Sequence, residues 1–209
     1  MLILSKNSHT AEGLVLMARD MLISGNVIAY PTETFYGIGA RYDSEDALNR
    51  IYLLKDRPHD KAMPLIIGRR ELLHSVAAEI TPLSEKLMDA FWPGPLTLIF
   101  RARSDLSGMI TADTGRVAIR IPGPSFALEL ARLLDFPITA TSANISGMPP
   151  ASDTETVIGY FDGALDAVMD LGKTEGGLPS TIVDMTGPAA VIAREGVIRK
   201  EEILSALAQ

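Results

Sequence analysis

The chain of 209 residues contains no cysteine and only three histidines. The absence of cysteine excludes disulfide bonds, a thiolate nucleophile, and zinc or iron–sulfur sites with cysteine ligands. The histidines, His9, His59 and His74, lack the spacing of metal ligands. The chemistry available to this protein is therefore not that of a cysteine enzyme or of a histidine-ligated metal centre.

Long apolar runs and an excess of positive charge are also missing. No apolar run reaches the roughly 18 residues needed to cross a bilayer. The N-terminus, MLILSKNSHT, lacks the basic head and long apolar stretch of a secretory signal. The formal net charge of −7 argues against broad, non-specific binding of nucleic acid, but it leaves room for a local basic patch. We expect a cytoplasmic protein with no membrane partner.

Three familiar motifs are present only in part. DLGKT at 170–174 resembles the end of a P-loop, but Ala167 replaces the required first glycine. YGIGARY at 36–42 has a tyrosine in place of the third glycine of the dinucleotide fingerprint. GPSFA at 123–127 lacks the last glycine of a nucleophile elbow, and no histidine follows it as a base. If the protein is an enzyme, it must act by positioning reactants and stabilising charge.

The hydrophobic share of 47% supports a sizeable core, and the length suits one domain over 1–209. Apolar, β-branched runs predict strands at 2–4, 26–30, 64–67, 96–100, 117–121, 137–141, 180–184 and 189–193. Helical patterns fall at 10–24, 82–91, 124–134, 154–161 and 200–208, and Ser44 is expected to cap a further helix. This order predicts an α/β domain with a mixed sheet, including antiparallel pairs where strand candidates follow one another directly.

A basic segment, KDRPHDK at 55–61, stands out in this acidic chain. Its three cations, Lys55, Arg57 and Lys61, suit a triphosphate, and each charge-assisted hydrogen bond contributes roughly 1.5–3 kcal/mol. The alternative is that they complement the C-terminal dipole of the preceding helix.

Polar side chains follow two predicted strands. YPTETFYGIGA (30–40) places hydroxyl groups at a strand end, where open α/β sheets bind ligands. PITATSANISG (137–147) runs into Ser142 and Asn144, which suit phosphate oxygens or a ribose. The alternatives are a strand-to-helix turn with threonine caps for 30–40, and a helix cap or turn for 137–147.

Arg120 ends an apolar run in RVAIRIP (116–122). It alternates with Val117 and Ile119, so its side chain is expected on the opposite face of the strand. An arginine inside a sheet needs a carboxylate or phosphate partner, whereas an arginine on the surface face does not. Ser180 and Arg194 lie beside later strands in a similar way.

Seven segments occur in order: YPTETFYGIG, KDRP with Lys61, WPGPLTLIF, VAIRIP, TSANISG, STIVD and REG. Together they resemble the YrdC-like family of threonylcarbamoyl-adenylate synthases. The resemblance implies a twisted mixed sheet surrounded by helices, with a positively charged concave site. It also implies that L-threonine, bicarbonate and ATP, with Mg²⁺, give threonylcarbamoyl-AMP and pyrophosphate. Separate tRNA-threonylcarbamoylation proteins then use the product to modify a tRNA adenosine.

The resemblance also implies site residues. The family's catalytic positions fall on Lys55, Arg57, Ser142 and Asn144. Its ATP site falls on Arg57, Lys61, Ser142, Asn144 and Arg194. Its threonine site falls on Thr34, Arg120 and Ser180, with Arg120 on the carboxylate. No metal ligands of the protein are expected, because magnesium would be held mainly by ATP and water, and Glu33 is the one carboxylate considered.

Departures from the family pattern are few. Ala62 stands where a proline often follows the lysine, PGPS (122–125) replaces a frequent Pro-x-His-Pro, and Gly68 stands where some members have histidine. Longer members carry a second domain, which we do not expect in this sequence.

Three other functions remain open. A non-catalytic module would bind double-stranded RNA or tRNA by its phosphates. A related domain would form carbamoyl-adenylate from carbamoyl phosphate, although the larger proteins with such domains carry cysteine-rich zinc segments. A paralogue would keep the fold and use a different substrate.

Overall fold

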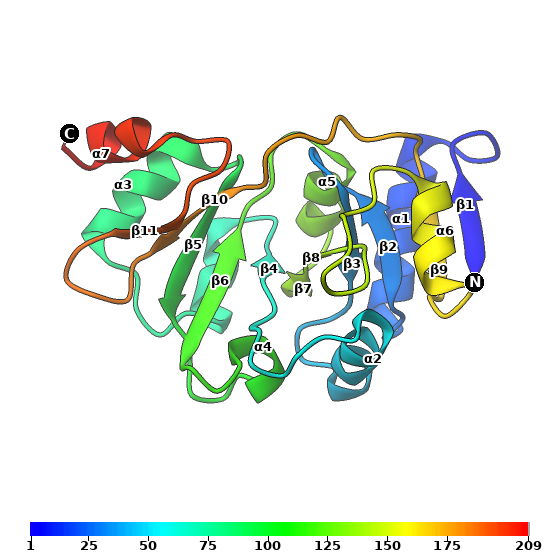
Figure 1. Cartoon of the computed structure of the whole chain (residues 1–209), viewed down its shortest axis with the longest axis horizontal. Helices are drawn as coiled ribbons and strands as arrows, with labels where there is room; N and C mark the ends of the chain where they lie inside the picture. Colours follow the sequence, from blue (N-terminus) through cyan, green and yellow to red (C-terminus); the bar gives the residue numbers. More distant parts are fainter. Residues whose placement is uncertain (209) are drawn as a thin grey trace.

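A computed structural model describes residues 1–208, which form two mixed β-sheets with helices packed around them (Figure 1). The strands are β1 (Leu2–Ser5), β2 (Ile28–Pro31), β3 (Tyr36–Gly39), β4 (Leu65–Ile66), β5 (Leu96–Arg101), β6 (Arg116–Arg120), β7 (Ile138–Thr139), β8 (Thr141–Ser142), β9 (Ala167–Asp170), β10 (Thr181–Asp184) and β11 (Val191–Arg194). The helices are α1 (Ala11–Ile23), α2 (Glu45–Lys55), α3 (Pro82–Phe91), α4 (Gly108–Thr111), α5 (Phe126–Arg132), α6 (Thr154–Phe161), α7 (Lys200–Ala208) and the 3₁₀ helix η1 (Arg70–Ser75).

The strands divide between two sheets. The first sheet has the order β1-β9-β2-β3-β8 and the second has the order β11-β10-β5-β6-β4-β7. The pairs β5–β6 and β10–β11 are antiparallel, whereas β5 and β10 are parallel. The mixed α/β class and the expected antiparallel pairs are therefore confirmed, but the strands form two sheets where the sequence suggested one. Figure 1 shows the second sheet in the left half of the molecule and the first sheet in the right half.

The chain passes between the two sheets at Ala140. Strand β7 pairs with β4 in the second sheet, and β8 pairs with β3 in the first. The hydrophobic core crosses the same boundary, because one buried cluster contains Ile38 of β3 together with Leu98 of β5, both fully buried. Residues that follow β7 and β8 therefore lie where the two sheets meet.

Local sequence signals explain where the helices begin. The Ser44 hydroxyl accepts the N–H of Ala47 at the start of α2, as expected for an N-cap. At α3, Thr81 and Ser84 form a reciprocal capping box around Pro82. Helix α2 then ends at Lys55, which is the first residue of the basic segment.

Among residues 1–208, no helix combines the length and apolar character that crossing a bilayer requires.

Candidate functional site

Residues 32–35 form the loop of a β-hairpin between β2 and β3. The Thr32 hydroxyl accepts the N–H groups of Thr34 and Phe35 at 3.2 and 3.3 Å, and it donates to the Phe35 carbonyl at 2.7 Å. The Thr34 carbonyl accepts the N–H of Gly176 at 2.9 Å. The strand-to-helix turn considered from the sequence is therefore wrong, and the loop is a tight hairpin that holds Glu33 in a fixed position.

Glu33 pairs with Arg120 from the other sheet. Arg120 Nη1 donates to Glu33 Oε1 at 2.6 Å, and the side chains are 11% and 19% exposed. The backbone N–H of Gly123 also lies 3.4 Å from this oxygen. Val117 and Ile119 are fully buried on the opposite face of β6, which confirms the predicted orientation of Arg120. The carboxylate partner that a sheet arginine requires is therefore Glu33, which accepts from Arg120 through Oε1.

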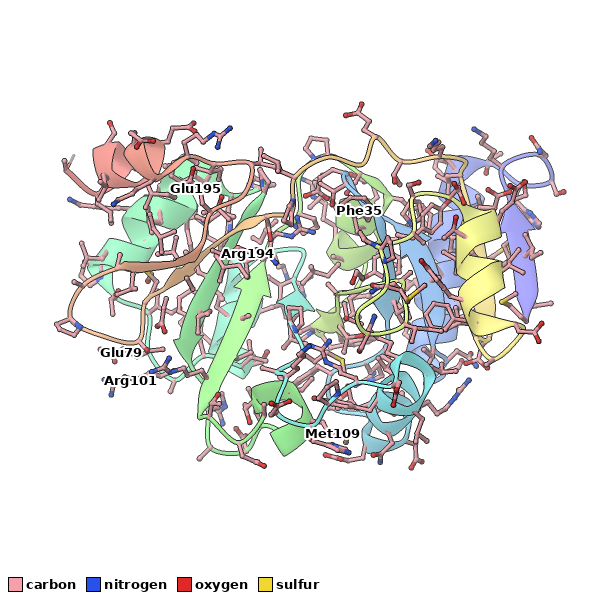
Figure 2. The ribbon with its side chains drawn as sticks, viewed as in Figure 1. Phe35, Glu79, Arg101, Met109, Arg194 and Glu195 are labelled. Atoms are coloured by element: carbon pink, nitrogen blue, oxygen red, sulfur yellow. The ribbon has the colours of Figure 1, made fainter. Side chains whose placement is uncertain are left out.

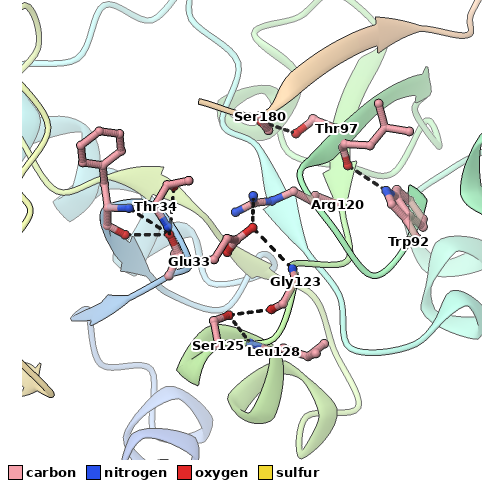
Figure 3. A network of polar contacts seen from close by, with 12 residues as sticks. Glu33, Thr34, Trp92, Thr97, Arg120, Gly123, Ser125, Leu128 and Ser180 are labelled. Carbon is pink, nitrogen blue, oxygen red and sulfur yellow. Dashed lines mark hydrogen bonds and ion pairs between the residues drawn. The ribbon is translucent and has the colours of Figure 1, made fainter. Parts of the chain in front are cut away.

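Ser180 and Arg194 lie near this ion pair. The Ser180 hydroxyl shares a hydrogen bond of 2.9 Å with the Thr97 hydroxyl, and Arg194 Nη2 donates to the Ser180 carbonyl at 2.8 Å. Figure 3 shows the Arg120 side chain between Glu33 and the Ser180–Thr97 pair. Burial, together with the positive charge of Arg120, lowers the pKa of Arg194. Two arginines that repel one another in this way form a ready site for an anion.

Thr97 was not expected from the sequence. It is 5% exposed and lies in β5 among apolar neighbours. Its hydroxyl fixes that of Ser180, which the family resemblance assigns to threonine binding. A polar residue inside an otherwise apolar strand was the signal that could have revealed it.

Lys55 is buried at the end of α2, where it is 2% exposed. Its ammonium donates to the carbonyl of Ser142 and, at 2.6 Å, to that of Asn144. Its own carbonyl accepts the N–H of Ser146 at 2.7 Å. Residues 142–148 are called the Ser/Asn turn. Lys55 therefore holds this turn in place by hydrogen bonds to the backbone groups of the turn.

The Ser/Asn turn also stabilises itself. The Ser142 hydroxyl donates to Asn144 Oδ1, and Asn144 Nδ2 donates to the carbonyls of Ile145 and Met148 at 2.9 and 2.8 Å. Asn144 is 8% exposed, whereas Ser142 is exposed. The register of β8 on β3 places Ser142 opposite Gly37, so the turn lies beside the hairpin that carries Glu33.

The rest of the basic segment folds back on itself. Arg57 Nη2 donates to the Ala62 carbonyl at 2.6 Å and Arg57 Nε donates to the Lys61 carbonyl at 3.1 Å. The Lys61 side chain is exposed. Lys55 is thus buried, Arg57 bonds to the backbone of its own loop, and Lys61 faces solvent. The three cations therefore do not form a single positive surface.

Lys55 gives the protein a pH-dependent contribution to stability. Burial and the neighbouring charge of Arg57 lower the pKa of Lys55 from 10.5 to about 7. Between these values the unfolded chain binds a proton that the folded protein lacks, so the free energy of unfolding rises with pH. In urea titrations between about pH 7.5 and 9.5, we expect the wild type to gain about 1 kcal/mol per pH unit relative to Lys55→Met. Parallel pH dependences in the two proteins would contradict this expectation.

Two glycines allow the backbone to pack closely near the residues that the family resemblance assigns to threonine binding. A Cβ on Gly196 would lie 2.1 Å from the Pro179 carbonyl oxygen, so only glycine lets the segment after Arg194 pack against Ser180. A Cβ on Gly68 would lie 2.3 Å from the Ala131 carbonyl oxygen of α5. Position 68 therefore has no room for the histidine found there in some family members.

Figure 2 shows Arg194 in the half of the molecule that contains the second sheet, and Phe35 on the hairpin loop of the other half. The residues assigned to threonine binding come from both halves, because Thr34 lies on that loop, Arg120 ends β6 of the second sheet, and Ser180 directly precedes β10 of that sheet. No cluster of three or more His, Cys, Asp or Glu side chains that could hold a metal occurs in the described part of the chain. The site therefore offers cations, hydroxyl groups and one carboxylate, which suit an anionic ligand with an amino group.

Comparison with known proteins agrees with this geometry. The family model Sua5/YciO/YrdC, described as "Telomere recombination", matches residues 20–196. The chain is 37% identical to the threonylcarbamoyl-AMP synthase of Pyrococcus abyssi over 202 residues, which cover 97% of this chain and 59% of that protein. It is 37% identical to the enzyme of the same name from Bacillus subtilis, over 93% of this chain and 56% of that protein. The chain thus spans less than two thirds of these curated relatives.

Solved structures give the same result. The structure of P. abyssi Sua5 in complex with L-threonine matches with a TM-score of 0.89 and 35% identity, over 98% of this chain and 60% of that chain. Escherichia coli YciO matches with a TM-score of 0.83 over 97% of this chain and 98% of that chain, and at 22% identity it supports the fold alone. Because the family model covers most of the sequence and confirms the resemblance carried by its motifs, the chain belongs to the Sua5/YciO/YrdC family.

Proposed function

We propose that this protein forms threonylcarbamoyl-AMP and pyrophosphate from L-threonine, bicarbonate and ATP. The observation that carries the proposal is the convergence of Thr34, Arg120 and Ser180, which come from segments far apart in the sequence, around one ion pair where the two sheets meet. The relative that was solved with L-threonine shares this fold over nearly the whole chain. Such a reaction requires a site for an amino acid next to a positively charged site for ATP.

In this proposal Arg120 binds the threonine carboxylate, and the hydroxyl groups of Thr34 and Ser180 fix the rest of the substrate. Arg120 is suited to this role because only one hydrogen bond to the protein engages its guanidinium among residues 1–208. A guanidinium has five N–H donors in a planar fork, so the remaining donors match a second carboxylate.

ATP would bind on the side of the Ser/Asn turn, with Arg194, Arg57 and Lys61 supplying positive charge and Ser142 a hydroxyl group. Mg²⁺ would enter as part of the ATP substrate, held mainly by the phosphates and water. Lys55 would act by shaping the turn, with its charge close to the phosphates.

The chemistry needs no nucleophile from the protein. The threonine amine adds to carbon dioxide with loss of a proton, or reacts with bicarbonate with loss of water, and gives a carbamate. A carbamate oxygen then attacks the α-phosphate of ATP as pyrophosphate leaves. The protein's contribution is to hold the reactants together and to offset the charge of the phosphates. We further propose that tRNA-threonylcarbamoylation proteins receive the product in the cytoplasm, and that the protein also binds double-stranded RNA or tRNA.

Release of pyrophosphate tests the proposal. With ATP and Mg²⁺ present, we expect pyrophosphate only when both threonine and bicarbonate are added, and a large drop when either is omitted. Carbamoyl phosphate should not replace the pair, since that outcome would indicate the carbamoyl-adenylate reaction. RNA binding that falls steeply with salt, without any consumption of ATP, would instead indicate a binding module.

A further inference from the structure

One oxygen of Glu33 has no hydrogen-bond partner. Oε1 accepts from Arg120 at 2.6 Å and lies 3.4 Å from the N–H of Gly123. Oε2 is buried, and no group in residues 1–208 donates to it. Buried carboxylate oxygens nearly always have a donor, because leaving one unsatisfied is unfavourable. This oxygen is therefore available to a donor that a ligand or an ordered water supplies.

The protein groups around Glu33 are already engaged. The hydroxyl of Tyr30, whose pKa is raised by burial, donates to the Thr139 carbonyl at 2.9 Å. The hydroxyl of Thr34 shares a contact of 3.3 Å with that of Thr32, and the hydrogen bonds of Thr32 keep the hairpin loop tight. If one of these hydroxyl groups turned to donate to Glu33 Oε2, it would lose the hydrogen bond that it makes now. The neighbouring hydroxyl groups therefore leave Oε2 without a donor.

The free oxygen of Glu33 and the free donors of Arg120 belong to one ion pair. The pair therefore offers an acceptor with negative charge and donors with positive charge side by side. The zwitterionic head of an α-amino acid has the complementary arrangement, with an ammonium group and a carboxylate on one carbon. A ligand with only a carboxylate would satisfy Arg120 and leave Oε2 without a donor.

We propose that Glu33 Oε2 binds the α-ammonium group of the amino acid substrate while Arg120 binds its carboxylate. The inference rests on the proposed function, which it refines by naming the residue that recognises the reacting amine. The ion pair would thereby select a free α-amino acid and hold its nitrogen in a fixed position before the nitrogen loses a proton and reacts.

Ligand binding without ATP and bicarbonate tests this inference. Calorimetry would compare L-threonine with 3-hydroxybutyrate, which lacks the amino group, on the wild type and on Glu33→Gln. Glutamine keeps the shape and one oxygen for Arg120, but it replaces the other acceptor with an NH₂ donor. We expect the wild type to prefer threonine at least about tenfold. In Glu33→Gln the affinity for threonine should fall about tenfold while that for 3-hydroxybutyrate stays within about twofold.

The outcomes separate this inference from the function on which it rests. If Glu33 only positions Arg120, both ligands should weaken equally and the preference for threonine should survive, which overturns the inference and leaves the function intact. Wild-type protein that binds no threonine would overturn both. Should Glu33→Gln fail to fold, the wild-type comparison decides alone, since equal affinities for the two ligands contradict a role for the ammonium. Glu129→Gln, which removes an exposed carboxylate paired with Arg132 on α5, is the matched control and should change neither affinity.

Discussion

Lys55→Met is expected to lower turnover in pyrophosphate release between about tenfold and a hundredfold, the range for losing one or two charged hydrogen bonds. The ammonium of Lys55 donates to two carbonyls of the Ser/Asn turn, those of Ser142 and Asn144. Without it, both carbonyls lose their donor, and below about pH 7 the turn also loses the positive charge that lies beside it. Methionine has a similar length and preserves the packing of the aliphatic stem, so the change removes the ammonium rather than creating a cavity.

The fold should survive this substitution better than the activity. Removing a buried charge relieves its desolvation, which offsets part of what the two unpaired carbonyls cost. Lys86→Met is the matched control, because Lys86 is exposed and also donates to one backbone carbonyl, that of Leu207 at 3.2 Å. We expect this control to retain turnover. Near-normal turnover in Lys55→Met, with the cooperative thermal transition intact, would show that the turn does not need its lysine.

The orientation of Arg120 was predictable because it depends only on local alternation. Strand residues alternate between two faces, so burial of Val117 and Ile119 places Arg120 opposite them. Its partner was not predictable, because Glu33 lies 87 positions earlier and reaches Arg120 from the other sheet. Hydrophobic periodicity reports which face a residue occupies, but it does not report which segment packs against that face.

Strand β3 was missed because glycines lower strand propensity, and Gly37 and Gly39 lie within its four residues. The structure gives the reason for one of them. A Cβ on Gly39 would lie 2.4 Å from Cε1 of Tyr30, so the tyrosine ring occupies the space of the missing side chain. Gly39 is therefore a packing requirement between two strands of the first sheet.

The division into two sheets was also hidden from pattern analysis. Residues 137–141 form one strand-like run, and the sequence predicts a single strand there. In the structure β7 and β8 lie on either side of Ala140 and pair with different sheets. The change of partner depends on contacts with β4 and β3, which are distant in the sequence. The Ser/Asn turn could be recognised by its composition, but its place between the sheets required the tertiary structure.

Arg120→Met is expected to raise the KM for threonine about a hundredfold while the KM for ATP changes by less than about threefold. A bidentate contact with the substrate carboxylate consists of two charge-assisted hydrogen bonds of roughly 1.5–3 kcal/mol each, and each 1.4 kcal/mol is a factor of ten. Steady-state release of pyrophosphate, with each substrate varied in turn, measures the two constants. Equal changes in both would indicate a general loss of structure rather than loss of the carboxylate contact.

Two further variants make this result specific. Arg120→Lys keeps a positive charge beside Glu33 but loses the planar fork, so its KM for threonine should lie between those of the wild type and Arg120→Met. Arg116→Met is the matched control, because Arg116 lies on the same strand, is exposed, and pairs with Asp184 at 2.9 Å. Each substitution removes an ion pair, but only Arg120 lies beside the other residues proposed to bind threonine. A large rise in the KM for threonine in Arg116→Met, or none in Arg120→Met, would place the carboxylate site elsewhere.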